Sequence, residues 1–215
     1  MTDYEISELI SQEFDLKLLG VTEQYLEIHE PVYENGLLKI DRIDREKDDV
    51  IIAYLPVKGE YFFFAVYFDP ISNQILNIST ESRNIVSLIV SSETMTSKEL
   101  LNLTNLQCSK FWDKGDLRPN TKRKYTFTGI EFYLVPEPDE FEDKLRKLLD
   151  YLETDKSGIL ALSSKGLAYI KVCMDFHYCN QLLGGFTLDV EILKKISDLN
   201  LKLDFQITAW GKPFR

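Results

Sequence analysis

Runs of apolar and aromatic residues in the first third of the chain alternate with short charged or Gly- and Pro-containing segments. This spacing predicts β-strands joined by turns, that is, an antiparallel meander. Residues 61–68 are hydrophobic at both odd and even positions, whereas a strand on the surface keeps one polar face. We therefore expect cover on both faces, from the N-terminal helix and the C-terminal half, or alternatively from a second copy or a partner. The predicted meander strands are residues 37–43, 50–57, 61–68 and 74–79.

Two Thr-x-x-Glu patterns predict the starts of helices. In each pattern the Thr hydroxyl accepts a hydrogen bond from the first turn, and the Glu side chain reaches back to the Thr backbone. Thr2 and Glu5 begin an N-terminal helix whose apolar residues recur at helical spacing. Thr96 and Glu99 begin another helix, which Asn105 is expected to end.

Residues 85–90 are β-branched and apolar on both faces, which predicts a short central strand. The polar residues 80–84 precede it and resemble a boundary, but they lack the Gly and Pro of a flexible linker. We therefore expect two tightly packed parts. Residues 1–82 would form a helix and β-meander subdomain, and residues 83–215 an α/β sandwich domain.

The C-terminal half alternates between strand and helix patterns. A change of phase within residues 122–135 predicts a strand with a bulge at Gly129. Asp139 and Glu142 are expected to cap the next helix. Residues 159–162 read as a short apolar piece, residues 167–178 as a strand, residues 187–200 as a helix capped by Thr187, and residues 201–209 as a half-exposed edge strand. The predicted fold class is α+β: an N-terminal helix plus antiparallel β-meander, then a two-layer α/β sandwich with helices on one face of a mixed sheet.

The net charge and the cysteine content limit the classes of partner and the cellular location that we expect. The net charge is -10, and the densest basic run, residues 122–124, is only three residues long. Such a chain repels phosphate backbones and anionic lipids, so we expect neither nucleic acid nor membrane as a partner. The three cysteines, an odd number, and the absence of an apolar export segment predict reduced thiols and a cytoplasmic location.

The search for catalytic chemistry is mostly negative. Cys173, Asp175, His177 and Cys179 share one face of a predicted strand, but the two cysteines would lie ~20 Å apart along it. A four-ligand zinc site fails on that distance, and a Cys nucleophile with His177 as its base lacks a group to orient it. His29 has no cysteine or paired carboxylate near it and is expected on the surface. The sequence thus predicts no cofactor, no metal and no catalytic residue.

The loop at residues 111–116 is the best candidate for binding. Trp112 stands next to Lys114, Gly115 and Asp116, which combines a large aromatic ring with groups that need water. Two roles are open. In the structural one, Trp112 closes the core, Gly115 supplies a positive φ and Asp116 accepts backbone hydrogen bonds within its own turn. In the functional one, Trp112, Lys114 and Asp116 form a recognition surface.

The order of elements from residue 84 to residue 211 resembles the uncharacterised bacterial domain-of-unknown-function family 4279. The resemblance rests on the segments 114–116, 145–149 and 201–205 and leaves residues 4–81 outside. Some members of that family are thought to be immunity proteins that neutralise toxins, so the resemblance implies a non-enzymatic protein-binding module with a toxin-like partner. It implies no catalytic residue. One alternative is a homodimer. The other is a small-ligand binder or an enzyme, with a cleft between the halves that Trp112 and residues 61–68 would line.

Overall fold

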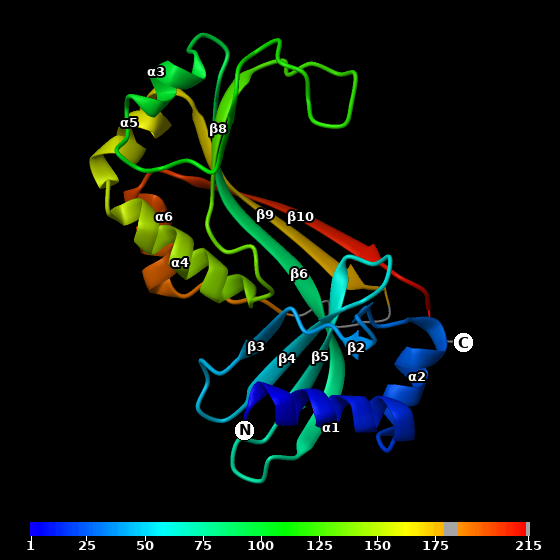
Figure 1. Cartoon of the computed structure of the whole chain (residues 1–215). Helices are drawn as coiled ribbons and strands as arrows, with labels where there is room; N and C mark the ends of the chain where they lie inside the picture. Colours follow the sequence, from blue (N-terminus) through cyan, green and yellow to red (C-terminus); the bar gives the residue numbers. More distant parts are fainter. Residues whose placement is uncertain (179–184, 214–215) are drawn as a thin grey trace.

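The computed structural model describes residues 1–178 and 185–213, which form one large sheet with helices packed on it (Figure 1). In chain order the elements are α1 (Asp3–Leu16), α2 (Gly20–Ile28), β1 (Tyr33–Glu34), β2 (Leu37–Leu38), β3 (Arg42–Asp44), β4 (Ile51–Pro56), β5 (Phe62–Phe68), β6 (Ile75–Ser92), α3 (Ser97–Leu101), β7 (Lys110–Trp112), β8 (Thr128–Tyr133), α4 (Phe141–Glu153), α5 (Lys156–Lys165), β9 (Leu167–His177), α6 (Val190–Asp198) and β10 (Lys202–Trp210). The eight-stranded sheet follows the order β10-β9-β6-β5-β4-β3, with β8 paired to β6 and β7 paired to β8. Strands β1 and β2 form a separate pair.

Strand β6 runs through both halves of the molecule. Over its 18 residues it pairs first with β5 and then with β9 and β8, all antiparallel to it. The polar residues 80–84, expected to separate two strands, lie inside β6. Ser82 Oγ donates to Asn84 Oδ1 over 2.8 Å, and Asn84 Nδ2 donates to the carbonyl of Asp139 over 3.0 Å. Ser82 and Asn84 are therefore buried with hydrogen-bond partners, whereas the hydroxyl of the buried Thr80 has none among the described residues.

Hydrophobic clusters lie on both parts of the sheet. One cluster joins α1 to strands β4 and β5 through Ile6, Ile10 and Phe64. Another lies between strands β6, β8 and β9 and helices α4, α5 and α6. On the second face of β5, Phe63 packs with Tyr54 in a smaller cluster. Strand β5 is therefore buried on both faces, as its sequence predicts.

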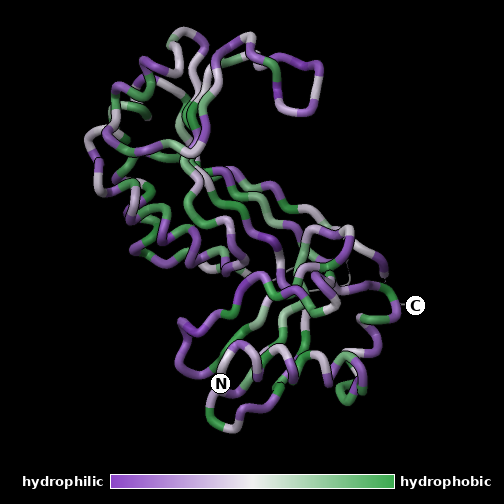
Figure 2. The backbone as a smooth tube through the Cα atoms, viewed as in Figure 1, coloured by the Kyte–Doolittle hydropathy of each residue, from purple (hydrophilic) through white to green (hydrophobic). Residues whose placement is uncertain are grey.

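The predicted α+β class is confirmed. Strands β9 and β10 are parallel and the other pairs are antiparallel, so the sheet is mixed, and β10 lies at its edge. Figure 1 shows helices α3 to α6 gathered on one side of the sheet. In Figure 2 hydrophobic residues concentrate along the strands, and hydrophilic residues dominate the hairpin that projects at residues 113–127. No helix within the described ranges has both the length and the apolarity that crossing a bilayer requires.

Several helix ends differ from the sequence prediction. Both capping boxes, Thr2 with Glu5 and Thr96 with Glu99, are present. Helix α3 already ends at Leu101, however, and the segment expected as a short apolar piece is helix α5, whose first turn is capped by Asp155. Helix α6 begins after Asp189, which caps it in place of Thr187. Asp lies nearer to the first turn here and supplies a stronger, charged acceptor.

Two predicted strands are also shorter. The expected strand 37–43 is split between β2 and β3, and the expected strand 122–135 is reduced to β8. The register between β6 and β8 is regular across Gly129, so the predicted bulge is wrong. Glycine is required at this position for another reason, because a Cβ there would lie 2.6 Å from Cε2 of Trp112. The indole ring packs directly on the backbone of β8.

Candidate functional site

Within residues 1–178 and 185–213, one face of the C-terminal part of the sheet carries no helix. Helices α4, α5 and α6 pack on the side of β9 that carries Ile170 and Val172. The opposite face, called here the open face, consists of alternate residues of four neighbouring strands. By register these are Arg83, Ile85, Ser87, Ile89 and Ser91 of β6, Tyr169, Lys171, Cys173 and Asp175 of β9, Lys202, Asp204, Gln206 and Thr208 of β10, and Glu131 and Tyr133 of β8.

The open face mixes both signs of charge with tyrosine rings. Lys171 lies beside Asp204 on β10 and beside Ser87 on β6. Tyr169 occupies the next row along, beside Ile89. Ser87 and Ile89 are buried on this face, with 1% and 9% of their surface exposed. The result is a polar surface with apolar positions at its centre, the composition found at many protein interfaces.

An aromatic and charged cluster closes the lower end of the open face. The Arg83 guanidinium lies 4.5 Å from the centre of the Tyr61 ring and 3.1 Å from Asp175 Oδ2. The Tyr61 and Trp210 rings are 4.8 Å apart, and Trp210 Nε1 donates to Asp175 Oδ1 over 2.7 Å. Asp175 is thus held by a cation and an indole.

The residues weighed for metal or nucleophile chemistry do not meet in one site. Asp175 contacts Arg83 and Trp210. Cys173 Sγ lies 4.0 Å from Gln206 Oε1, and His177 contacts His29. Cys108 and Cys173 are free thiols, and Cys179 lies outside the described residues. Within those residues no group of three or more His, Cys, Asp or Glu side chains could hold a metal ion.

His29 is not on the surface, which corrects the sequence prediction. It is 5% exposed at the end of α2, and its Nε2 lies 3.0 Å from Nε2 of His177. His177 Nε2 is also 3.2 Å from the carbonyl oxygen of Lys212. A carbonyl only accepts, so this arrangement places a hydrogen on His177 Nε2 and makes His29 Nε2 the acceptor. The hydrogen of His29 then sits on Nδ1, 3.8 Å from Glu60 Oε1.

The surroundings of this histidine pair keep both rings neutral. Burial lowers the pKa of His29 to about 4, and the neighbouring His177 adds to the effect. Burial also lowers the pKa of His177. The chain passes over the pair at Gly211, whose φ is +90°, and a Cβ there would lie 2.9 Å from Cδ2 of His177. The pair therefore fastens α2 to the end of β9 and the C-terminal segment.

Residues 113–127 form a projecting hairpin, called here the arm, at the upper end of the open face (Figure 1). Trp112 at its base is 8% exposed and stacks on Tyr125 with 5.0 Å between ring centres. Cations extend this stack on both sides. Lys110 Nζ lies 5.6 Å from the Trp112 ring centre, and the Arg118 guanidinium lies 5.2 Å from that of Tyr125.

The turn at residues 113–116 shows the predicted structural features. Gly115 has φ +99°, and Asp116 Oδ2 accepts from the backbone N–H of Asp113 over 2.8 Å. The carboxylate of Asp113 in turn accepts from the backbone N–H and the hydroxyl of Ser97 at the start of α3. Lys114 is exposed. A binding role for Trp112, Lys114 and Asp116 stays a prediction.

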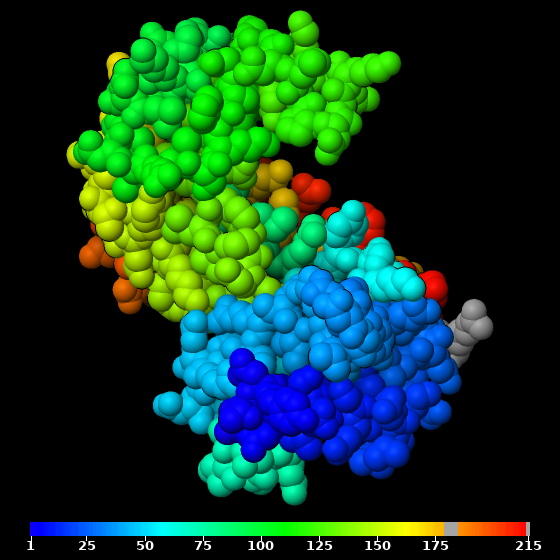
Figure 3. Space-filling model, viewed as in Figure 1, coloured from blue at the N-terminus to red at the C-terminus, as the bar shows by residue number. Residues whose placement is uncertain are grey.

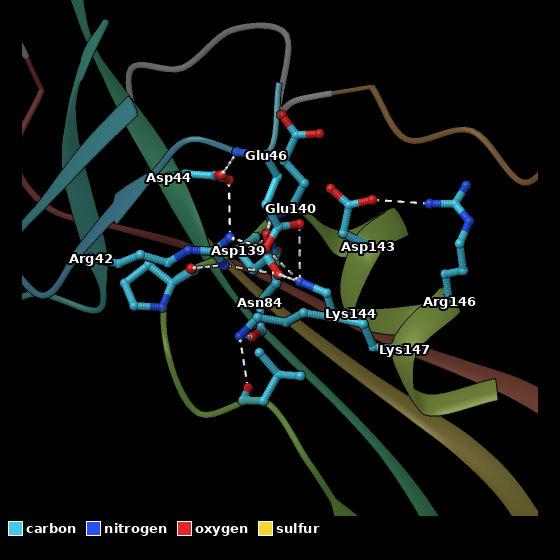
Figure 4. Close-up of polar contacts among 12 residues, drawn as sticks. Arg42, Asp44, Glu46, Asn84, Asp139, Glu140, Asp143, Lys144, Arg146 and Lys147 are labelled. Atoms are coloured by element: carbon cyan, nitrogen blue, oxygen red, sulfur yellow. Dashed lines mark hydrogen bonds and ion pairs between the residues drawn. The ribbon is translucent and has the colours of Figure 1, made fainter. Parts of the chain in front are cut away.

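A charge cluster joins β3 to the start of α4 (Figure 4). Asp139 is 2% exposed, and its Oδ2 lies 2.9 Å from both Arg42 Nη1 and Lys147 Nζ. Burial alone would raise the pKa of Asp139, but the hydrogen bonds from Lys147 and Arg42 outweigh it and hold the pKa below its ordinary value. Asp139 is therefore an ion-pair partner, and the prediction that it caps α4 together with Glu142 is wrong; the N-cap is Glu140, without a side-chain bond.

Lys144 lies beside this cluster and is almost completely buried. Its ammonium donates to the carbonyls of Asn84 and Val135 over 2.7 and 3.1 Å. Burial lowers its pKa to about 8. Every described member of the cluster is engaged in joining elements, which gives it a structural role.

Two hollows lie near these features. One of about 470 Å³ is bordered by Phe127 of the arm and by Ser91 and Tyr169 of the open face. The other, of about 310 Å³, lies between the halves and is bordered by Glu81 and Phe141. Neither is bordered by Trp112 or by residues 61–68, the lining expected for a cleft.

The sequence signal singled out the loop at residues 111–116, at the base of the arm, but it placed residues 122–127 in a strand and missed the open face and the histidine pair. The alternation of β9 was visible, yet which of its faces would carry helices was not. The pairing of His29 with His177 had no signal, since the two residues are 148 positions apart.

No curated protein and no solved structure matches the chain significantly. A family model matches residues 80–210, more than half of the chain, and this segment contains nearly all of the open face and the whole arm. The chain belongs to the family described as domain of unknown function (DUF4279), as its sequence predicts.

Proposed function

We propose that this chain is a non-enzymatic protein-binding module and that it acts as an immunity protein, neutralising a toxic protein by covering it with the open face. The observation that supports this is the open face itself, a sheet surface that no described helix covers, with tyrosines and charges of both signs around apolar positions. Such surfaces suit a protein partner, because a specific complex needs about 800 Å² of mixed surface from each partner.

The charges on this surface also favour binding over catalysis. Asp175 is neutralised by Arg83 and held by Trp210, so it is neither a free base nor a free acid. The two histidines contact each other within the junction instead of facing the open face. These acidic and imidazole groups are held in structural contacts, which suits recognition better than catalysis.

The location and partners follow from the same proposal. Free thiols at Cys108 and Cys173 support a reducing compartment, and we place the protein in the cytoplasm. The partner would be a toxin-like protein and not a nucleic acid or membrane, because the net charge is -10.

Co-expression tests this function. Each protein encoded beside the gene for this chain is produced in a host cell alone and together with the chain. We expect one neighbour to stop growth, the chain to restore it, and the purified pair to form an equimolar complex. Lys171→Glu on the open face should abolish both rescue and complex.

Lys194→Glu on α6 is the control on the helix side, because Lys194 is exposed, Lys171 is half-buried, and the two substitutions make the same change in charge. It should leave rescue intact. A complex that tolerates Lys171→Glu but not Lys194→Glu would place the interface on the helices and contradict the assignment. If the chain restores growth against none of the neighbouring proteins, the immunity role is contradicted.

A ligand-binding function has one observation in its favour. Glu81 borders the hollow between the halves, and burial raises the pKa of its carboxyl. A carboxyl group in a cleft with a shifted pKa is a common feature of ligand sites. A Glu81→Gln protein that loses saturable binding of a small polar compound bound by the parent would support this second candidate.

A further inference from the structure

We propose that the arm is a cationic clamp that holds an acidic segment of a protein partner beside the open face. This inference rests on the protein-binding function proposed above and adds the chemistry of the partner.

The arm concentrates unpaired positive charge on an acidic protein. Its cations are all exposed, and within the described residues none of them forms an ion pair. Elsewhere cations are commonly paired, as Arg42 is with Asp139 and Lys195 with Asp150. The arm cations outnumber its two acids, Asp113 and Asp116, and a net positive arm on a chain of net charge -10 suits a partner of the opposite sign. The arm cations are Lys114, Arg118, Lys122, Arg123 and Lys124.

The arm is built to hold one shape. Its two sides are joined by backbone hydrogen bonds from Tyr125 to Asp116 over 2.8 Å and from Arg118 to Arg123 over 2.8 Å. Asn120 at its tip has φ +56°, a conformation that Asn tolerates in turns. The Asp113 bonds to α3 fix its base. A partner that binds a preformed arm loses less conformational entropy than one that must order it.

The position of the arm directs a bound segment toward the open face. Figure 3 shows the arm projecting from the body of the molecule above an indentation in its outline. Phe127 of the arm and Tyr169 of the open face border the same hollow of about 470 Å³. A segment held by the arm cations would therefore continue onto the tyrosines of the open face.

The aromatic rings of the arm distinguish a protein from a nucleic acid. Single-stranded nucleic acids stack their bases on exposed rings. Here one face of Tyr125 is covered by Trp112 and the other by Arg118, and Trp112 is buried. Leu117, which is 64% exposed on the arm, suits an apolar side chain of a peptide.

Fluorescence anisotropy with defined probes tests the clamp on the full chain. The probes are a labelled Glu-Tyr copolymer peptide, a Lys-Tyr peptide of equal length, a DNA duplex, and vesicles of phosphatidylserine and phosphatidylcholine. We expect the Glu-Tyr peptide to bind and the others to bind at least about tenfold more weakly, with affinity that falls as salt rises. Tighter binding of DNA or vesicles would overturn the proposal, as would no binding of the Glu-Tyr peptide.

A matched pair of triple variants locates the binding. Replacing Lys122, Arg123 and Lys124 by Ser should weaken the Glu-Tyr peptide about tenfold or more. Replacing Lys17, Lys58 and Lys194 by Ser removes the same charge far from the arm and should change the affinity less than about twofold. Equal losses in the two variants would show a general charge effect and overturn the clamp.

The two proposals can fail separately. If the chain forms a complex with a neighbour's product and that complex survives the arm triple variant, the clamp is wrong and the protein-binding function stands. If the Glu-Tyr peptide binds the arm but the chain restores growth against no neighbouring protein, the immunity role is wrong and the clamp stands.

Discussion

The Nε2 atoms of His29 and His177 lie 3.0 Å apart in the interior, and only one of them can carry the hydrogen between them. This contact joins α2 to β9 as long as both rings are neutral. Their folded-state pKa values lie below the ordinary value, so the unfolded chain binds more protons once the pH falls below about 6.5.

We expect the stability to be complete above that pH and to fall as the medium is acidified, levelling off near the His29 pKa of about 4. Between pH ~7 and pH ~5 the loss should be about 1–2 kcal/mol. Urea unfolding across this range measures it. His29→Gln should flatten the curve, and an equally steep curve in that variant would assign the effect to other groups.

Asp139 gives a second prediction, because it is the buried anion of the charge cluster. Asp139→Asn leaves Arg42 and Lys147 without their buried partner and should cost about 3 kcal/mol of unfolding free energy. Glu46→Gln is the control: Glu46 contacts the same two cations but is largely exposed, so it should cost less than about 1 kcal/mol. Equal costs in urea unfolding would contradict the dominant role of Asp139.

The packing of Trp112 on Gly129 gives a third prediction. Trp112→Ala should cost ~3–5 kcal/mol, because a large buried ring is removed. Lys114→Ala should cost ~0–1 kcal/mol, because the side chain is exposed. A Trp112→Ala protein that melts like the parent would move the base of the arm from the core to the binding surface.

Gly129→Ala tests the same contact from the other side. The added methyl group would overlap the indole and should destabilise the parent by ~1–3 kcal/mol. In the Trp112→Ala background the same substitution should cost much less, since the ring is gone. Additive costs of the two changes in thermal melts would show that they do not share a contact.

These residues show which features could be read from the sequence. The capping boxes at Thr2 and Thr96 were predictable because a cap involves residues three apart. Asp139 was predicted to be a cap by the same reasoning from nearby residues, but its carboxylate forms an ion pair with Arg42, almost a hundred residues away. Likewise Gly129 was read as a bulge from the local pattern, but the strand is regular there, and the glycine is explained by the ring of Trp112 on the neighbouring strand, a tertiary contact. Local patterns therefore located most of the elements and the loop at residues 111–116, and long-range partners decided the rest.

Glu81 gives a further prediction. Its carboxylate accepts a hydrogen bond from the Tyr67 hydroxyl, and burial raises its pKa. A raised folded-state pKa means that stability present at acid pH is lost as the pH rises through it. Glu81→Gln keeps an acceptor for Tyr67 and removes the charge, so it should stabilise the protein at neutral pH by about 0.5–1 kcal/mol. Tyr67→Phe should destabilise it, and a destabilised Glu81→Gln protein would show that the charge is better compensated than burial implies.

The continuous strand β6 also sets a length scale for recognition. Its residues from Arg83, beside Tyr61 and Trp210, to Ser91, at the foot of the arm, are eight steps apart along one strand. At ~3.3 Å per residue this distance is ~26 Å. A partner that contacts both ends of the open face must therefore present a surface about as long as a small globular domain is wide, and a short peptide of a few residues can reach only one of them.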